Sequence, residues 1–243
     1  MEILTAIKRV PETGAKVSLT ADRTGIDTTS LGFTISPHEE CAIEEGVRLV
    51  EDHGGSVTAL TMGSEDATEQ LREAIAMGAD DGILVETDGG KRGPAATAKA
   101  IADEIDAADA DFDLLLFGNE AADSANHHVG VRVAEELGRP VVAGIKGLDV
   151  DGNTLVARLE IPGGAEVYEL ELPAVVPLQE GLHEPRYPSM RSKLRARQAP
   201  VARLEPGSHA DGLELVELSL PQTDDGHADV LRHTPAHAAD AVD

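Results

Sequence analysis

The chain has 243 residues and a formal net charge of −25, because 45 Asp and Glu residues outweigh 20 Lys and Arg residues. A field of that sign repels phosphate backbones and anionic membrane surfaces. With no Trp, two Tyr and three Phe, the chain also lacks the aromatic platforms on which single-stranded nucleic acids stack. We therefore expect no nucleic-acid partner.

The acidic composition is typical of proteins that stay hydrated at high salt, where screening removes the self-repulsion. We favour a halophilic protein over an ordinary acidic cytosolic one. A single cysteine, Cys41, excludes an internal disulfide framework and a Cys-rich metal site. No apolar stretch reaches the roughly 18 residues that span a bilayer, and the N-terminus lacks the layout of a signal peptide. The sequence predicts a soluble, cytoplasmic protein.

Four short apolar runs predict buried strands at residues 2–8, 56–62, 82–87 and 113–118. Helical patterns lie between them, and the first has the clearest ends. Ser36 can cap this helix, Pro37 suits its first position, and Glu39 stands at the capping-box spacing. Gly54 ends it. Further helices are predicted at 64–79, from near 94, and after 126.

Strands that alternate with single helices imply right-handed crossovers and a parallel sheet covered on both faces. The predicted fold class is α/β: a doubly wound, mostly parallel, Rossmann-like sheet of the kind that binds adenine nucleotides. From about residue 140 the turn signals predict antiparallel hairpin strands added to this sheet. We expect one domain over 1–200. Residues 201–243 form a C-terminal arm that packs on another chain or is partly disordered.

In open α/β sheets, ligands bind beyond the carboxyl ends of the strands. These ends are rich in small and polar residues at 6–10, 61–64 and 118–130, and the helix N-termini that follow can hold a phosphate. Neither nucleotide fingerprint, GxGxxG or GxxxxGK[ST], is present. The loops therefore predict a nucleotide site of another kind.

Reacting groups are not evident. The GxSxG nucleophile motif is missing, and the HxxxH spacing at 233–237 lies in a Pro-containing tail without a helical pattern, so we predict no catalytic residue and no metal site. Two classes remain. One is a nucleotide-binding regulatory protein, and the other is a subunit that supports a cofactor chemistry belonging to its partner.

Several strings in chain order resemble the small (beta) subunit of electron transfer flavoproteins, and together they cover roughly residues 1–200. They are AIKRVPET (6–13), DRTG (22–25), ISPHEECAIEEGVRL (35–49), LTMGSE (60–65), LREAIAMGADDGILVE (71–86), LLLFGNEAADSANHHVG (114–130) and LELPAVVPLQEGLHEPRYPS (170–189).

The resemblance implies a heterodimer whose large (alpha) subunit holds a redox FAD, and it implies an electron carrier rather than an enzyme. The small subunit would hold AMP as a structural group or, in bifurcating members, a second FAD. Electrons would come from acyl-CoA or other dehydrogenases and pass to a membrane quinone oxidoreductase, or run the other way. The alternative is a stand-alone nucleotide-binding regulator of stress-protein type.

By position, the resemblance implies a nucleotide pocket at strand ends and helix starts. Its residues would be Ala6, Ser36, Pro37, His38, Glu39, Met62, Gly118, Asn119, Glu120, Ala121, Asp123, Asn126, His127, His128 and Val129. The chain departs from the family at Glu120, which replaces an amide, and at Thr13, where some members have a Tyr near the flavin. SAN at 124–126, where bifurcating members tend to have GDT, favours AMP.

The stretch 181–200 carries five basic residues and one acidic residue in a strongly acidic chain. The resemblance implies that the loop near 184–197 docks dehydrogenases, with an apolar anchor at Met190 and arginines that pair with acidic surface of a partner. The docking set would be Glu160, Arg186, Tyr187, Met190 and Arg191. Glu160 matches a position that pairs with an Arg of the large subunit. The alternative for the basic stretch is a solvated helix.

Overall fold

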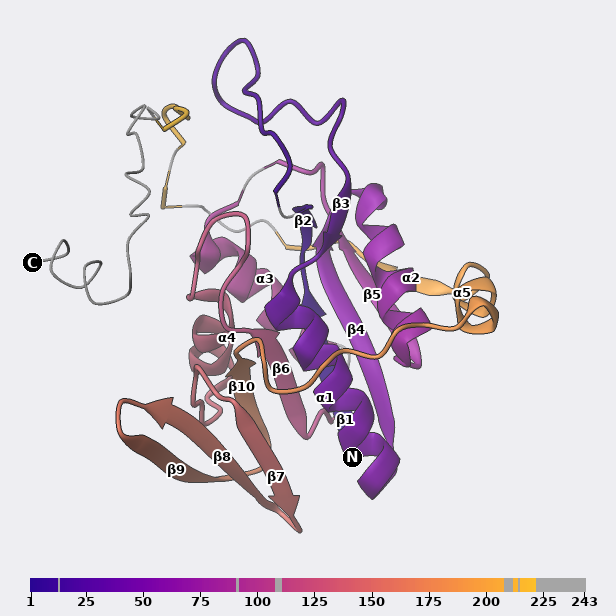
Figure 1. The fold of residues 1–243 in the computed structure, drawn as a ribbon, viewed down its shortest axis with the longest axis vertical. Coiled ribbons are helices and arrows are strands. Elements are labelled where there is room, and N and C mark those ends of the chain that lie inside the picture. The colour runs from indigo at the N-terminus through magenta and orange to yellow at the C-terminus, as the bar shows by residue number, and fades with distance from the viewer. Residues whose placement is uncertain (13, 91, 108–110, 208–211, 214, 222–243) are drawn as a thin grey trace, which may run out of the picture. The chain divides into compact units, whose positions relative to one another are not determined.

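Figure 1 shows a computed structural model of residues 1–243. The structure describes every residue except 13, 91, 108–110, 208–211, 214 and 222–243. The expectations about Thr13, the HxxxH spacing and most of the C-terminal arm therefore fall outside the described residues. The chain divides into two compact units, the larger made of Met1–Lys16 and Thr28–Glu214 and the smaller of Val17–Asp27 and Leu215–Asp243.

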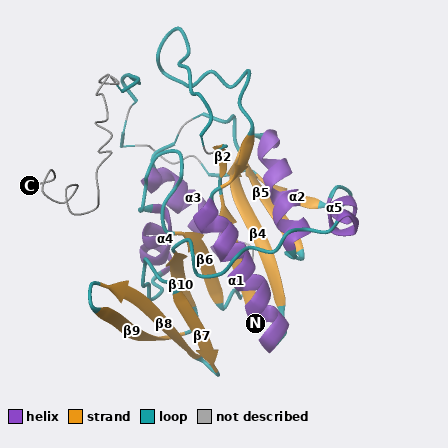
Figure 2. Ribbon diagram, in the orientation of Figure 1, coloured by secondary structure: helices purple, strands orange, loops and turns teal. Residues whose placement is uncertain are grey.

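The larger unit is built on a six-stranded sheet with the order β10-β6-β1-β4-β5-β11, in which every neighbouring pair is parallel. Figure 2 shows this sheet with helices packed on it. The fold class is confirmed. The strands are β1 (Glu2–Ile7), β4 (Ser56–Gly63), β5 (Asp81–Glu86), β6 (Leu114–Gly118), β10 (Ala174–Leu178) and β11 (Val201–Leu204).

Helices cover both faces of the sheet. Neighbouring side chains on each strand point to opposite faces, so a strand such as β1 contributes to two core clusters. Ile3 belongs to the core cluster beneath α1 and α2, whereas Leu4 belongs to the cluster beneath α3 and α4. The helices are α1 (Pro37–His53), the 3₁₀ turn η1 (Glu65–Ala67), α2 (Thr68–Met77), α3 (Pro94–Ala107), α4 (Val129–Leu137) and α5 (Met190–Ala196). No helix in the described part of the chain is long and apolar enough to cross a membrane.

The expectation that the hairpin strands join the main sheet is wrong. Strands β7 (Gly147–Asp151), β8 (Thr154–Ile161) and β9 (Gly164–Glu171) form an antiparallel sheet of their own. Residues 174–178, which we grouped with the hairpins, form β10 and pair in parallel with β6. Every residue of β10 is buried, as is usual for a parallel strand covered on both faces.

Two further strand elements have no counterpart in the sequence analysis. Residues 201–204 form β11 at the edge of the main sheet, beside β5. Strands β2 (Arg9–Pro11) and β3 (Phe33–Ile35) form a short antiparallel pair. The β3 segment leads directly into α1, so this pair sets the direction in which the chain enters that helix.

The capping box predicted at the start of α1 is formed only in part. Ser36 is the N-cap residue, but its side chain makes no capping hydrogen bond. The Glu39 carboxyl accepts a hydrogen bond from the Lys8 backbone N–H and also interacts with the Ser36 backbone N–H. The C-terminal signal is confirmed, since Gly54 ends the helix with a positive φ of 77°.

In the smaller unit, the described residues 215–221 lie along the segment 17–27. Leu218 donates a backbone hydrogen bond to the Arg23 carbonyl at 2.8 Å, and Arg23 Nη1 pairs with Glu217 at 2.9 Å. This part of the arm therefore has partners within its own chain. Packing of the arm on another chain stays a prediction.

Candidate functional site

The strand order reverses between β1 and β6. From β1 the chain crosses to β4 and β5 on one side, and it then returns through α3 to β6 on the other side of β1. A crevice outside the carboxyl ends of the strands at such a point is the usual ligand site in open α/β sheets. At this point Ala6 pairs with Phe117, one residue before Gly118.

The first turn of α1 lies directly against the end of β6. A Cβ atom placed on Gly118 would stand 2.7 Å from Glu39 Cγ and 3.2 Å from His38 Cβ. Real Cβ atoms essentially never lie within 3.0 Å of another heavy atom, so any side chain at 118 would displace Glu39 in the first turn of α1. Glycine at this position therefore brings the helix N-terminus to the switch point, with its positive end near the crevice.

Ser36 is the N-cap of α1 and is fully buried. Its Oγ has no hydrogen-bond partner among the residues that the structure describes. A buried hydroxyl without a partner costs about 1–3 kcal/mol, and a polar group of a bound ligand would remove that cost. This orphaned hydroxyl beside a helix N-terminus fits a nucleotide, whose phosphate and ribose supply such groups.

Glu39 is the most unusual charged residue at this edge. Its side chain is buried, and its Oε2 accepts the Lys8 N–H at 2.6 Å. Burial raises the pKa of the Glu39 carboxyl to about 8, against the lowering effect of the Lys8 hydrogen bond. At neutral pH the carboxyl is therefore mostly protonated, and it does not repel a phosphate as a charged carboxylate would.

Lys8 joins the end of β1 to the loop after β6. Its Nζ lies 2.6 Å from Asp123 Oδ1 in a partly exposed ion pair. Sequence reasoning did not single out Lys8, although the residue directly follows a buried strand in a region identified as a strand end. Its position at the end of a buried strand was a signal that could have identified Lys8. Its partner Asp123 could not be identified from the sequence, because 115 residues separate the two.

The loop from Asn119 to His128 is held by local contacts. Asn119 Nδ2 lies 3.3 Å from His127 Nδ1, and Glu120 Oε2 lies 3.5 Å from His127 Nε2. Ala121 donates its backbone N–H to the Asn126 carbonyl at 3.2 Å. Glu120, the departure from the family pattern, thus has a histidine beside it, and residues 122–128 are exposed to solvent.

Contacts link most of the predicted nucleotide pocket around this edge. Gly118 borders His38 and Glu39, Lys8 links Glu39 with Asp123, and His127 reaches back to Asn119. His128 is the N-cap of α4, although its side chain makes no capping bond, so this helix begins two residues later than predicted. Nucleotide binding by the predicted set stays a prediction.

Met62 stands near the end of β4, one residue past the last β1–β4 pair. It is half-buried and borders the core cluster that also contains Ala6. It lies at the same edge of the sheet as the other predicted residues.

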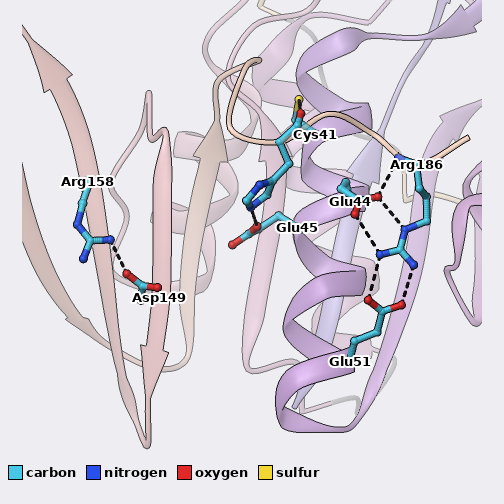
Figure 3. Close-up of polar contacts among 8 residues, drawn as sticks. Cys41, Glu44, Glu45, Glu51, Asp149, Arg158 and Arg186 are labelled. Carbon is cyan, nitrogen blue, oxygen red and sulfur yellow. Dashed lines mark hydrogen bonds and ion pairs between the residues drawn. The ribbon is translucent and has the colours of Figure 1, made fainter.

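The predicted docking residues differ in exposure. Tyr187 and Met190 expose 88% and 73% of their surface, and Arg191 is also exposed. Leu194, which was not among the predicted residues, exposes 57%. Arg186 instead bonds to Glu44 and Glu51 of α1, as Figure 3 shows. The basic stretch includes α5, whose N-cap Ser189 accepts a hydrogen bond from Ser192 N–H.

Glu160, predicted to pair with the large subunit, stands on β8 and is exposed. Its Oε2 lies 3.3 Å from Lys146 Nζ, so it has an ion-pair partner in its own chain. Nearby on the same small sheet, Arg158 pairs with Asp149 (Figure 3). A partner's arginine would therefore compete with Lys146 for Glu160.

Comparison with known proteins defines the class. Residues 24–208 match the family described as "Electron transfer flavoprotein domain". The chain therefore belongs to the electron transfer flavoprotein family, on the beta-subunit side that its sequence strings resemble.

The individual relatives agree with this assignment. The chain is 34% identical over 217 residues to "Electron transfer flavoprotein subunit beta" of Bacillus subtilis, which covers 89% of this chain and 82% of the relative. It is 34% identical to the Syntrophomonas wolfei protein of the same name, over 91% of this chain and 86% of the relative. The Homo sapiens relative is 34% identical, over 85% and 82% of the two chains.

Proposed function

We propose that this chain is the small subunit of a heterodimeric electron transfer flavoprotein. It holds an adenine nucleotide at the β1–β6 switch point, supports the FAD shared with a large (alpha) subunit, and makes no bonds itself. One observation supports the nucleotide assignment in this member of the family. The buried, unpartnered Ser36 hydroxyl lies at the start of α1, and Gly118 brings that start close to the end of β6 at the switch point.

Each group at the site has a role consistent with its contacts. Ser36 and the first turn of α1 offer hydrogen-bond donors to a phosphate or ribose. The neutral Glu39 accepts the Lys8 N–H without adding charge to the site. The Lys8–Asp123 pair holds the loop after β6 against the end of β1, next to the nucleotide. The bound flavin supplies the redox chemistry, and this chain positions and shields it.

The nucleotide is AMP in a carrier with one flavin and a second FAD in a bifurcating complex. Both place an adenine and a phosphate in the same pocket, so the residues proposed to hold them are shared. The chain works between acyl-CoA or other dehydrogenases and a quinone oxidoreductase or another acceptor. The exposed apolar residues Tyr187, Met190 and Leu194 support a dehydrogenase-docking surface.

The deciding experiment measures cofactor content. The chain is co-expressed with the large subunit encoded in the same genome, the complex is purified, and the cofactors are released by heat and quantified. One FAD and one AMP per heterodimer support a conventional carrier, and two FAD and no AMP support a bifurcating one. A folded, flavin-free monomer that binds ATP and forms no complex with the large subunit would overturn the proposal.

A further inference from the structure

A segment that we call the strap, residues 179–189, crosses α1 on its way from β10 to α5 (Figure 1). Side chains of α1 hold it at successive points. His38 Nδ1 accepts the Glu180 N–H at 3.2 Å, and Cys41 Sγ donates to the His183 carbonyl at 3.4 Å. His183 Nε2 lies 2.7 Å from Glu45 Oε2. The strap is therefore attached to α1 at several points before it reaches the exposed Tyr187 and Met190.

Arg186 makes the last and most extensive of these attachments (Figure 3). Its Nε and Nη2 donate to the two oxygens of Glu44 at 2.8 and 3.0 Å. Its Nη1 and Nη2 donate to the two oxygens of Glu51 at 2.7 and 3.1 Å. Its backbone N–H also donates to Glu44 at 3.0 Å. These bonds use four of the five guanidinium N–H groups.

This network favours arginine for two reasons. Glu44 is buried, so loss of its cation would leave a charged group without compensation inside the protein, which is strongly destabilising. A planar guanidinium bonds to both oxygens of a carboxylate, whereas a lysine ammonium acts as a point charge and does not reproduce the fork. The paired carboxylates raise the pKa of Arg186 further above its usual range.

The attachment lies directly before the exposed docking residues. Tyr187 is the next residue, and Met190 begins α5. With seven residues, α5 is far shorter than the roughly 12–15 residues at which an isolated helix becomes marginally stable. Its C-terminal end is anchored by the buried Ala196, and α5 packs on α2. The strap enters directly at its N-terminal end and is a further contact that sets the position of that end.

We propose that Arg186 is a positioning residue for dehydrogenase docking and does not itself contact the dehydrogenase. By fixing the strap to Glu44 and Glu51, it holds Tyr187, Met190 and Leu194 in the arrangement that a partner binds. Ordering these residues before the encounter lowers the entropy lost on binding. This inference rests on the proposed function, and it departs from the expectation that Arg186 pairs with acidic surface of a partner.

Glu51→Gln separates the two roles of Arg186, because only the positioning role predicts a rise in KM. If Arg186 positions the strap, the loss of Glu51 loosens it. The KM for the flavoprotein as electron acceptor of its dehydrogenase then rises, by about fivefold, with kcat unchanged. If Arg186 contacts the partner, removal of Glu51 frees the guanidinium for an acidic partner, and KM falls or stays the same.

A second pair of variants tests the geometry. Arg186→Gln and Arg186→Lys are both expected to raise KM, and lysine is not expected to rescue it, because a point charge cannot hold two carboxylates in one plane. Amide hydrogen exchange in peptides covering 184–197 of the heterodimer should accelerate in all three variants. Arg139→Gln is the control: it removes a hydrogen bond to the Phe112 carbonyl, which precedes β6 and belongs neither to the strap nor to α5, and both readouts should stay at the wild-type value.

The outcomes separate the inference from the proposed function. A lower or unchanged KM in Glu51→Gln, or full rescue by Arg186→Lys, overturns the positioning role while electron transfer continues. If the wild-type heterodimer accepts electrons from no acyl-CoA or other dehydrogenase, the proposed function fails and the docking role fails with it. Unchanged hydrogen exchange at 184–197 in Arg186→Gln overturns the claim that Arg186 holds the strap.

Discussion

Gly118 at the end of β6 and Glu39 in the first turn of α1 are in such close contact that a Cβ on Gly118 would stand 2.7 Å from Glu39 Cγ. The contact joins a strand and a helix that are adjacent at the switch point of the sheet, although they are 79 residues apart in sequence (118 minus 39). It places the start of α1, the buried Ser36 hydroxyl and the loop after β6 around one edge.

We expect Gly118→Ala to displace the start of α1 and to lower both stability and nucleotide retention. Overpacking of this kind typically costs about 1–3 kcal/mol. The measurements are the thermal unfolding midpoint of the heterodimer and its nucleotide content after gel filtration. Gly164→Ala is the matched control, because a Cβ there meets no atom within 4 Å. Equal nucleotide retention in the two variants would contradict the proposed site.

The raised pKa of Glu39 predicts a specific pH dependence of stability. The pKa rises from 4.5 for an unperturbed glutamate to about 8 in the folded protein, so the folded state favours the protonated carboxyl. The stabilisation is complete below pH 4.5 and is lost as the pH rises through 8. Glu39→Gln, which mimics the protonated group, should therefore match the wild type at about pH 5 and exceed it at about pH 9.

The readout is the unfolding midpoint of each variant at about pH 5, 7 and 9, and the expected gap at the highest pH is at least about 4 °C. Glu65→Gln serves as the control, because Glu65 is exposed and lies outside the proposed pocket. A gap between Glu39→Gln and the wild type that is the same at the lowest and the highest pH would show that Glu39 does not titrate in this range.

Lys8→Met should loosen the loop after β6, because it removes the ion pair with Asp123. A partly exposed ion pair is worth about 1 kcal/mol at most, so nucleotide affinity should fall about fivefold, and less at high salt. Calorimetric titration of nucleotide-stripped heterodimer measures this change. Lys99→Met removes a comparable exposed pair with Asp103 on α3, and its affinity should equal that of the wild type. A loss as large in Lys99→Met would refute a specific role for Lys8.

Met190→Ala should weaken coupling to a dehydrogenase without changing flavin content. Met190 exposes 73% of its surface beside Tyr187, and truncation of an apolar hot-spot residue costs about 2 kcal/mol, or roughly 30-fold in apparent affinity. Steady-state reduction of the flavoprotein by its dehydrogenase measures the change. Val131→Ala removes an exposed apolar residue of α4 and should have no effect. Unchanged electron-transfer rates in Met190→Ala would rule out an anchor role.

Local sequence patterns predicted most of the secondary structure. Buried apolar runs located β1, β4, β5 and β6, and Pro37 and Gly54 marked the ends of α1. These signals act within a few residues of each other, since they concern backbone conformation and the period of burial. The alternation of strands and helices then predicted the parallel, doubly wound sheet. The strings shared with electron transfer flavoprotein beta subunits indicated the family.

Contacts between distant segments decided the rest. A buried run such as 174–178 is compatible with either strand direction, and only pairing with β6 makes β10 parallel. The Glu39 carboxyl of the predicted capping box also accepts a hydrogen bond from Lys8 N–H, 31 residues away, and no local pattern indicates this bond. The sequence predicted that Arg186 pairs with a partner protein, whereas the fold places it against Glu44, 142 residues away. Hydrogen bonds, burial and charge at these positions depend on which segments meet in space, and that is a property of the tertiary structure.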